Sequence, residues 1–204
     1  MIDITRKLHS GFPTWPGDTE CSFEMVAKIS EGSSVNVGRL VTTTHLGTHL
    51  DAPLHYSDAG SPLGEIPLEV LIGPCLVLDA RGHKVLPVSL LDGLEAFPER
   101  VAFFTGEPSE WTTFPTDFSH FDPALIDLLG QKGVKLLVTD APSVDHLTSK
   151  DLPAHQACLR NQILILEGVD LNGVDFKTYE LVCLPLNLQE ADAAPARAIL
   201  RDTL

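Results

Sequence analysis

One short stretch, His45–His55, concentrates groups that bind divalent metals or move protons near neutral pH. It holds three histidines and one carboxylate within eleven residues: His45, His49, Asp51 and His55. Gly47 and Pro53 interrupt the stretch, so its backbone is predicted to bend rather than to continue one regular element. A bent chain can point several of these side chains at one ion or one reacting atom.

The spacing of the first two histidines sets a condition on that bend. His45 and His49 are four residues apart and would share a face on a helical turn. On an extended strand they would lie about 13 Å apart, at roughly 3.3 Å per residue, too far for one ion. A shared site therefore requires a turn or a helical twist across residues 46–48, which Gly47 makes easy. Asp51 lies off the ideal helical face and is expected to need a further bend before Pro53.

Two histidines and an aspartate would leave coordination positions open on an ion. Catalytic metal sites have that property, whereas structural zinc sites are closed by four protein ligands, often cysteines. An open Lewis-acidic ion lowers the pKa of bound water toward about 7 and polarises a carbonyl, which is hydrolytic chemistry. The alternative for His45, His49 and Asp51 is a hydrogen-bonded polar turn without metal.

Two further residues are placed where a second segment could reach this site. Glu167 ends the apolar run 163–166, and strand ends are where α/β folds usually bind ligands. His155 lies on a predicted helix just upstream. The pair could complete one metal site or build a second, with Asp51 bridging two ions. Taken alone, His155 would be a partly buried surface histidine and Glu167 a solvated carboxylate.

The elements that must position these residues indicate an α/β fold. Alternating apolar residues at 35, 37 and 41 indicate a strand, and short apolar runs indicate strands at 70–78, 101–104, 134–138, 163–166 and 179–186. Asp122-Pro123 begins a helix with an apolar stripe that ends near Gly130 or Gly133. A second helix starts at Ser149 or Asp151 and runs through His155 and Leu159. We expect a mixed, barrel-like sheet with helices on the outside.

Length, charge and cysteine content limit the expected number of domains, the binding partners and the cellular compartment. Residues 1–204 are expected to form one domain. The net charge of −14 argues against nucleic acid and anionic membranes as partners. Without an apolar signal or spanning segment, the chain is expected to be cytoplasmic, with its four scattered cysteines as buried thiols.

The motifs together resemble those of the cyclase family of metal-dependent hydrolases. His45–His55 matches the family signature H-x-G-T-H-x-D-x-P-x-H, and the similarity extends over nearly the whole chain. Further matching segments are 14–18, 140–145, 149–155, 165–168, 179–181 and 195–198. Ala141 stands where the pattern has threonine and Ala196 where it has valine, and neither supplies a ligand. The family fold is an α/β swivelling domain of β/β/α type.

The resemblance implies a specific ligand set with two zinc ions per subunit. His45, His49 and Asp51 would hold one zinc; Asp51 and His155 would hold the second, and Glu167 would bridge both. Nitrogen and oxygen ligands suit zinc, manganese and iron alike, so the native metal stays open. The resemblance also implies a homodimer.

The resemblance also implies an activity. It is strongest to those family members that hydrolyse the aryl formamide N-formyl-L-kynurenine to L-kynurenine and formate. His55 would be the proton donor and acceptor. Alternatively, His55 would be a third metal ligand or would contact the ligands without binding the metal. Trp15, between two prolines, would contact the substrate ring. Lys150 and Arg39 are candidate partners of the substrate carboxylate. The alternatives are hydrolysis of another cyclic or aryl amide, such as isatin, and a non-catalytic metal-binding protein.

Overall fold

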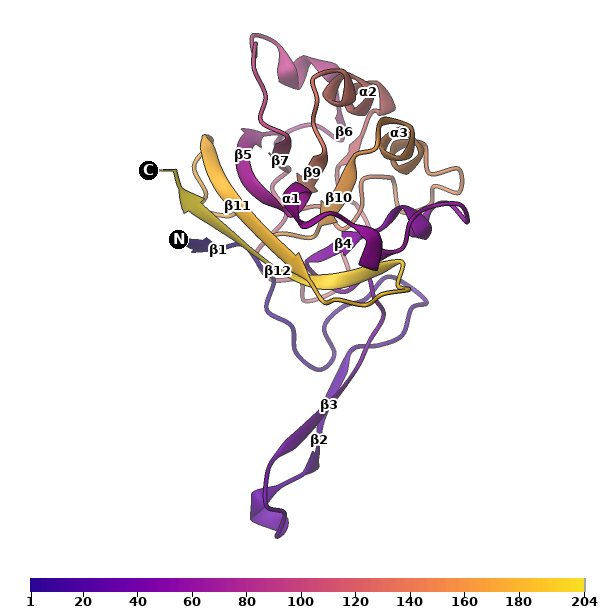
Figure 1. Ribbon diagram of the computed structural model, residues 1–204, viewed down its shortest axis with the longest axis vertical. Coiled ribbons are helices and arrows are strands. Elements are labelled where there is room, and N and C mark those ends of the chain that lie inside the picture. The colour runs from indigo at the N-terminus through magenta and orange to yellow at the C-terminus, as the bar shows by residue number, and fades with distance from the viewer. Residues whose placement is uncertain (204) are drawn as a thin grey trace.

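The computed structural model describes residues 1–203, which form twelve strands, three α-helices and short 3-10 turns (Figure 1). The strands are β1 Ile2–Asp3, β2 Ser22–Ala27, β3 Val37–Val41, β4 His49–Asp51, β5 Ile72–Asp79, β6 Val85–Leu86, β7 Arg100–Phe104, β8 His120–Phe121, β9 Leu136–Thr139, β10 Leu164–Glu167, β11 Thr178–Pro185 and β12 Ala193–Asp202. The helices are α1 Leu68–Leu71, α2 Pro123–Gln131 and α3 Pro153–Asn161.

The main sheet closes on itself through the long strand β12. The strand order is β12-β11-β5-β7-β9-β10-β4, and β4 pairs with β12 to complete the ring. β12 pairs with β4 through residues 193–195 and with β11 through residues 196–202. β1 pairs with β12 further along, at residues 199 and 200. This closure confirms the expected mixed, barrel-like sheet.

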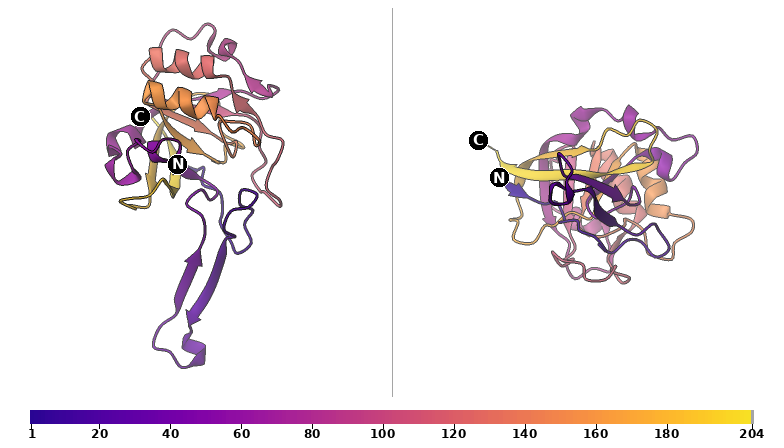
Figure 2. Two further views of the ribbon diagram at one scale, coloured as in Figure 1. Left: turned by 90° about the vertical axis from the view of Figure 1, so that its right-hand side faces the viewer. Right: turned by 90° about the horizontal axis from the view of Figure 1, so that it is seen from below.

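Helices α2 and α3 cover one outer face of the barrel. Strands β5, β7, β9 and β10 run parallel, and α2 and α3 are the crossovers from β7 to β9 and from β9 to β10. The two helices lie side by side on the sheet (Figure 2). One apolar core fills the barrel interior and a second packs between sheet and helices. The α/β class with outer helices is therefore as expected.

Several element boundaries differ from the sequence-based predictions. The apolar run 70–78 is divided between α1 and β5. Helix α3 begins at Pro153 without a side-chain cap from its own N-cap residue, so neither Ser149 nor Asp151 starts it as predicted. Strand β12 was not among the predicted strands. Its sequence contains four alanines and a proline, residue types that are depleted in strands, so the local pattern does not indicate one.

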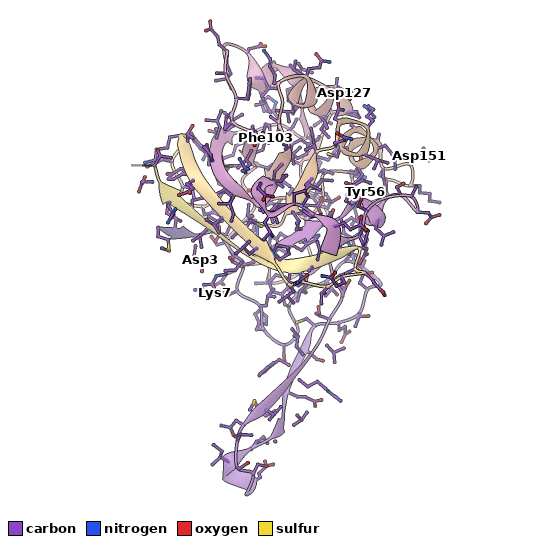
Figure 3. The ribbon with its side chains drawn as sticks, in the orientation of Figure 1. Asp3, Lys7, Tyr56, Phe103, Asp127 and Asp151 are labelled. Carbon is purple, nitrogen blue, oxygen red and sulfur yellow. The ribbon has the colours of Figure 1, made fainter. Side chains whose placement is uncertain are left out.

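A two-stranded hairpin, residues 22–41, projects from the body of the molecule and is called the arm below (Figures 1 and 2). It consists of β2, β3 and a 3-10 turn at Ile29–Glu31. Its side chains extend on both sides with nothing packed over them (Figure 3). Eight large apolar side chains of the arm are exposed: Phe23, Met25, Val26, Ile29, Val35, Val37, Leu40 and Val41.

Two further sequence expectations concern the whole chain. The four cysteines are free and buried, as predicted: Cys21, Cys75, Cys158 and Cys183. Among residues 1–203, every helix is too short or too polar to cross a lipid bilayer.

Candidate functional site

Strand β4 carries two of the predicted ligands on one face. β4 pairs antiparallel with β10, and His49 lies directly opposite Glu167 in that register. Because alternate residues of a strand point to the same side, Asp51 shares the face of His49 and Glu167. Leu50 points the other way, into the barrel interior. The further bend expected before Pro53 is therefore not needed, because His49 and Asp51 are two residues apart on one strand.

The bend predicted at Gly47 is present and brings His45 to the same place. Gly47 has a φ of +57°, a left-handed conformation that favours glycine, and β4 begins two residues later. The ring centroids of His45 and His49 lie 5.0 Å apart. Nδ1 of His49 donates to the carbonyl oxygen of Gly47 at 3.0 Å, so its Nε2 faces Asp51 and Glu167.

His155 reaches the cluster from the first turn of α3, where Asp145 holds it in place. The carboxylate of Asp145 accepts the backbone N–H groups of Ala154 and His155, each at 2.9 Å. It also accepts a hydrogen bond from Nδ1 of His155 at 2.7 Å. Nε2 of His155 then faces Asp51, 3.6 Å from Oδ2. Asp145 thus stabilises the helix start and fixes the orientation of the imidazole.

Asp51 lies at the centre of the cluster and is fully buried. Its Oδ1 lies 3.1 Å from Nδ1 of His45 and 3.4 Å from Nε2 of His49, while its Oδ2 faces His155. Neither oxygen accepts a well-oriented hydrogen bond from the described residues. A buried carboxylate without hydrogen bonds is costly unless a cation compensates it. This donor set fits a metal ion, since it offers imidazole nitrogens and carboxylate oxygens from several directions.

Glu167 repeats this two-sided arrangement. Its Oε2 lies 3.5 Å from Nε2 of His49, and its Oε1 lies 3.9 Å from Nε2 of His155. Oε1 also accepts the backbone N–H of Val144 at 2.8 Å, which orients the carboxylate. Two groupings have ligand atoms within 4.8 Å of one another: His49, Asp51 and Glu167 in one, and His45, Asp51 and His55 in the other. The first joins β4 to β10, and His155 belongs to neither grouping.

His55 lies beside the cluster and differs from the other three histidines. It ends the 3-10 turn Pro53–His55, and 32% of its side chain is exposed. Its ring centroid is 4.0 Å from that of His45 and 5.8 Å from that of His155. Burial lowers the pKa of His55, which favours the neutral imidazole, able to accept a proton. The geometry permits both a ligand role, through the second grouping, and a proton-transfer role.

The surroundings of the other imidazoles favour positive charge. Burial by itself lowers their pKa values, but the neighbouring carboxylates outweigh it. The pKa of His45 rises to about 9, and those of His49 and His155 rise to about 10. Burial raises the pKa of Asp51, yet the three imidazoles hold it well below its usual range. A site that stabilises protons so strongly also stabilises a metal cation in their place.

Asp192 is a residue of the site that the sequence-based prediction missed. Its carboxylate accepts hydrogen bonds from Nε2 of His45 and Oγ1 of Thr44, each at 2.9 Å, and lies 3.6 Å from Nδ1 of His55. It directly precedes β12, the strand that closes the barrel beside β4. Only that long-range pairing brings it to the histidines. No local spacing in the sequence indicates it.

A cavity of about 250 Å³ opens onto the cluster and has a largely apolar wall. The wall is formed by Pro13, Trp15, Trp111, Phe114, Pro142 and Leu152. Trp15, the predicted contact of the substrate ring, is one of these lining residues. Trp111 and Phe114 carried no sequence signal, although aromatic residues are dense between 111 and 118. Lys150 and Arg39, the candidates for binding the substrate carboxylate, do not line the cavity.

The aromatic wall is held by contacts within the protein. The rings of Trp15 and Phe114 have centroids 5.3 Å apart, in edge-to-face orientation. The guanidinium of Arg6 stacks on Trp111, with 3.9 Å between its Cζ and the ring centroid. Arg6 also donates hydrogen bonds to the backbone of the 105–111 loop, at the carbonyl of Pro108. A flat aromatic molecule can therefore enter a preformed slot whose base carries His55 and the cluster around Asp51.

Comparison with known protein families and curated proteins gives matches over most of the chain. The family model described as "Putative cyclase" matches residues 2–146. A kynurenine formamidase of Erythrobacter litoralis (strain HTCC2594) is 44% identical over 206 residues, covering 98% of this chain and 93% of that protein. A kynurenine formamidase of Geobacillus thermodenitrificans (strain NG80-2) is 41% identical, covering 98% and 96%.

Solved structures agree with the fold. A potential metal-dependent hydrolase with cyclase activity superposes with a TM-score of 0.83 at 28% identity, covering 97% of this chain and 95% of that chain. Isatin hydrolase A from Labrenzia aggregata gives a TM-score of 0.82 at 20% identity, covering 100% and 93%. At that identity, the second match concerns the fold alone.

Proposed function

The chain belongs to the cyclase family, and we propose that it hydrolyses N-formyl-L-kynurenine to L-kynurenine and formate. The observation that carries this proposal is an aromatic cavity whose base is a buried cluster of imidazoles and carboxylates around Asp51. The names of the two curated relatives supply the substrate. An aryl formamide combines a flat ring for such a wall with an amide for such a base.

We propose that His45, His49 and Asp51 hold one divalent ion, and that His155 with Asp51 holds a second. Glu167 would bridge the two. This assignment is supported by the two oxygens of Asp51, which face different histidines, and by the same division in Glu167. Zinc suits these ligands, and manganese or iron would serve as well. Bound ions of this kind polarise a carbonyl and lower the pKa of a bound water.

We assign proton transfer to His55. In hydrolysis, water adds to the formyl carbon, the C–N bond breaks, and the departing aniline nitrogen must gain a proton. A neutral imidazole can take the proton from the attacking water and return it to that nitrogen. The lowered pKa of His55 and its access to the cavity support this role. The carboxylate of Asp192, 3.6 Å from Nδ1 of His55, would favour one orientation of the imidazole.

Trp15 is proposed to stack on the substrate ring. It lines the cavity, and its contact with Phe114 limits its movement. Stacking of aromatic rings contributes about 0.5–1.5 kcal/mol beyond the burial of their surface. The ring would thereby be held with its formamide toward the cluster.

We also propose that two copies of the chain associate through the arm. An isolated two-stranded hairpin is marginally stable in water, so its exposed apolar residues need a cover. The arm carries two basic residues, Lys28 and Arg39, and two acidic residues, Glu24 and Glu31, so its charges cancel although the chain carries −14. A second copy presents the same neutral, apolar surface, and a two-fold contact would cover both arms at once.

The deciding experiment is formate release from N-formyl-L-kynurenine by the metal-replete protein. We expect hydrolysis that a strong chelator abolishes and added zinc restores. Isatin, offered in parallel, tests the related ring-opening activity. Absence of formate release from metal-replete protein, or faster turnover of isatin, would contradict the proposed substrate.

A further inference from the structure

A tight turn joins the indole in the cavity wall to a carboxylate. Residues 15–18 form a β-turn in which the N–H of Asp18 donates to the carbonyl of Trp15 at 3.0 Å. Pro16 occupies the second position, and Gly17 occupies the third with a φ of +97°, the arrangement of a type II turn. The turn fixes Trp15 and Asp18 relative to each other, and both line the cavity.

The carboxylate of Asp18 has few interactions with other side chains of the described residues. Its one hydrogen bond from a side chain, donated by Oγ1 of Thr43, is long at 3.4 Å. Among residues 1–203, Asp18 takes part in no ion pair, and the lining of the cavity includes no lysine or arginine. Asp51, Glu167 and Asp192 differ, because each faces at least one imidazole. Asp18 is thus a cavity carboxylate available to a cationic group of a ligand.

We propose that Asp18 binds the α-ammonium group of the substrate and so selects for its amino-acid end. The inference rests on the proposed function. If the ring lies on Trp15 and the formamide at the cluster, the amino-acid chain on the adjacent ring carbon can extend along the cavity wall. Asp18 closes the turn that begins at Trp15 and lines the same cavity, so it is the carboxylate that this chain can reach. The substrate carboxylate, with no lysine or arginine in the wall, would remain in solvent.

The test compares two substrates that differ only at the amino-acid end. N-formyl-L-kynurenine carries the ammonium group, whereas 2′-formamidoacetophenone keeps the ring, ketone and formamide without it. The wild-type protein is assayed first, so that failure of the proposed function shows as absent turnover of N-formyl-L-kynurenine. The quantity of interest is the ratio of kcat/KM for the two substrates, measured for wild type, Asp18→Asn and Glu20→Gln.

We expect Asp18→Asn to lower that ratio roughly tenfold, mainly through KM, because a charge-assisted hydrogen bond is lost. Glu20→Gln removes an exposed charge of the same loop that does not line the cavity, and should leave the ratio unchanged. An unaltered ratio in Asp18→Asn overturns the inference. So does an equal loss on both substrates, which would mean that Asp18 only stabilises the turn.

Discussion

Oδ2 of Asp145 lies 2.7 Å from Nδ1 of His155, and the same carboxylate accepts two backbone N–H groups at the start of α3. The position of the imidazole is therefore tied to the position of the helix. A ligand held in this way has a fixed orientation and a more basic free nitrogen.

Removing the charge of Asp145 should weaken metal binding. We expect Asp145→Asn to lower the affinity for zinc by about 10–100-fold, because the hydrogen bond that orients His155 is weakened. Competition with a chromophoric chelator measures this affinity. Asp151→Asn, an exposed position just before the same helix, is the control and should bind zinc as the wild type does. Equal affinity in Asp145→Asn would show that the contact has no effect on the metal.

His55→Ala separates the two roles open to His55. We expect kcat to fall by about 10²–10⁴-fold with metal content unchanged, because proton transfer is lost while the ligands remain. Elemental analysis and steady-state kinetics on the same preparation measure both quantities. His83→Ala changes an exposed histidine outside the cavity and serves as the control. A loss of metal in His55→Ala would instead make His55 a ligand, as the grouping with His45 and Asp51 allows.

Glu167→Gln tests the proposed bridging role of this carboxylate. The amide keeps the size of the side chain but has no negative charge and one acceptor oxygen instead of two. We therefore expect fewer equivalents of zinc per chain after dialysis, as measured by elemental analysis. Glu65→Gln, which neutralises an exposed carboxylate, should retain the wild-type content. Full zinc content in Glu167→Gln would remove Glu167 from the ligand set.

The raised pKa of Glu107 predicts a pH dependence of stability that is separate from the candidate metal site. Burial, and then the negative charge of Asp140, raise the pKa of Glu107 to about 7 from 4.5. Between these values the folded protein holds a proton that the unfolded chain releases, so stability falls as pH rises through this window. Above pH 7 Glu107 is ionised in the folded protein as well, and the free energy of unfolding is lowered by the whole cost of burying that charge.

Glu107→Gln removes this penalty. We expect the variant to gain free energy of unfolding over the wild type at pH 8 and to gain little at pH 5. Urea unfolding of chelator-treated protein at both pH values measures the difference without a contribution from metal. Glu110→Gln, in the same loop but exposed, provides the comparison. A gain that is equal at both pH values would argue against the raised pKa.

The arm should control association. We expect Leu40→Asp to shift the protein from dimer to monomer, because it places a charge in the surface that the second copy would cover. Light scattering coupled to size-exclusion chromatography gives the mass directly. Leu68→Asp changes a similarly exposed leucine on α1 of the body, away from the arm, and should leave the mass unchanged. A wild-type protein that is already monomeric contradicts the proposed association.

Much of the layout followed from local sequence patterns. The apolar runs at 101–104 and 163–166 coincide with β7 and β10, and Asp122 caps α2 through the N–H of Ala124 as predicted. These patterns are readable because burial on a strand or helix imposes a short period on the residues concerned. The alternation at 35, 37 and 41 also marks a strand, β3, yet its side chains are exposed on the arm. An alternating pattern therefore predicts a strand but does not show whether another part of the protein covers its apolar face.

By itself, the sequence determined the chemical types in the site and one backbone condition: three imidazoles and a carboxylate around a glycine that must bend. Tertiary structure alone decided how they meet. The register of β4 against β10 sets His49 opposite Glu167, and the extended conformation of β4 makes a second bend unnecessary. Closure of the barrel by β12 delivers Asp192, and the start of α3 delivers Asp145. Strand pairing and helix docking join residues far apart in the chain, so no local spacing encodes them.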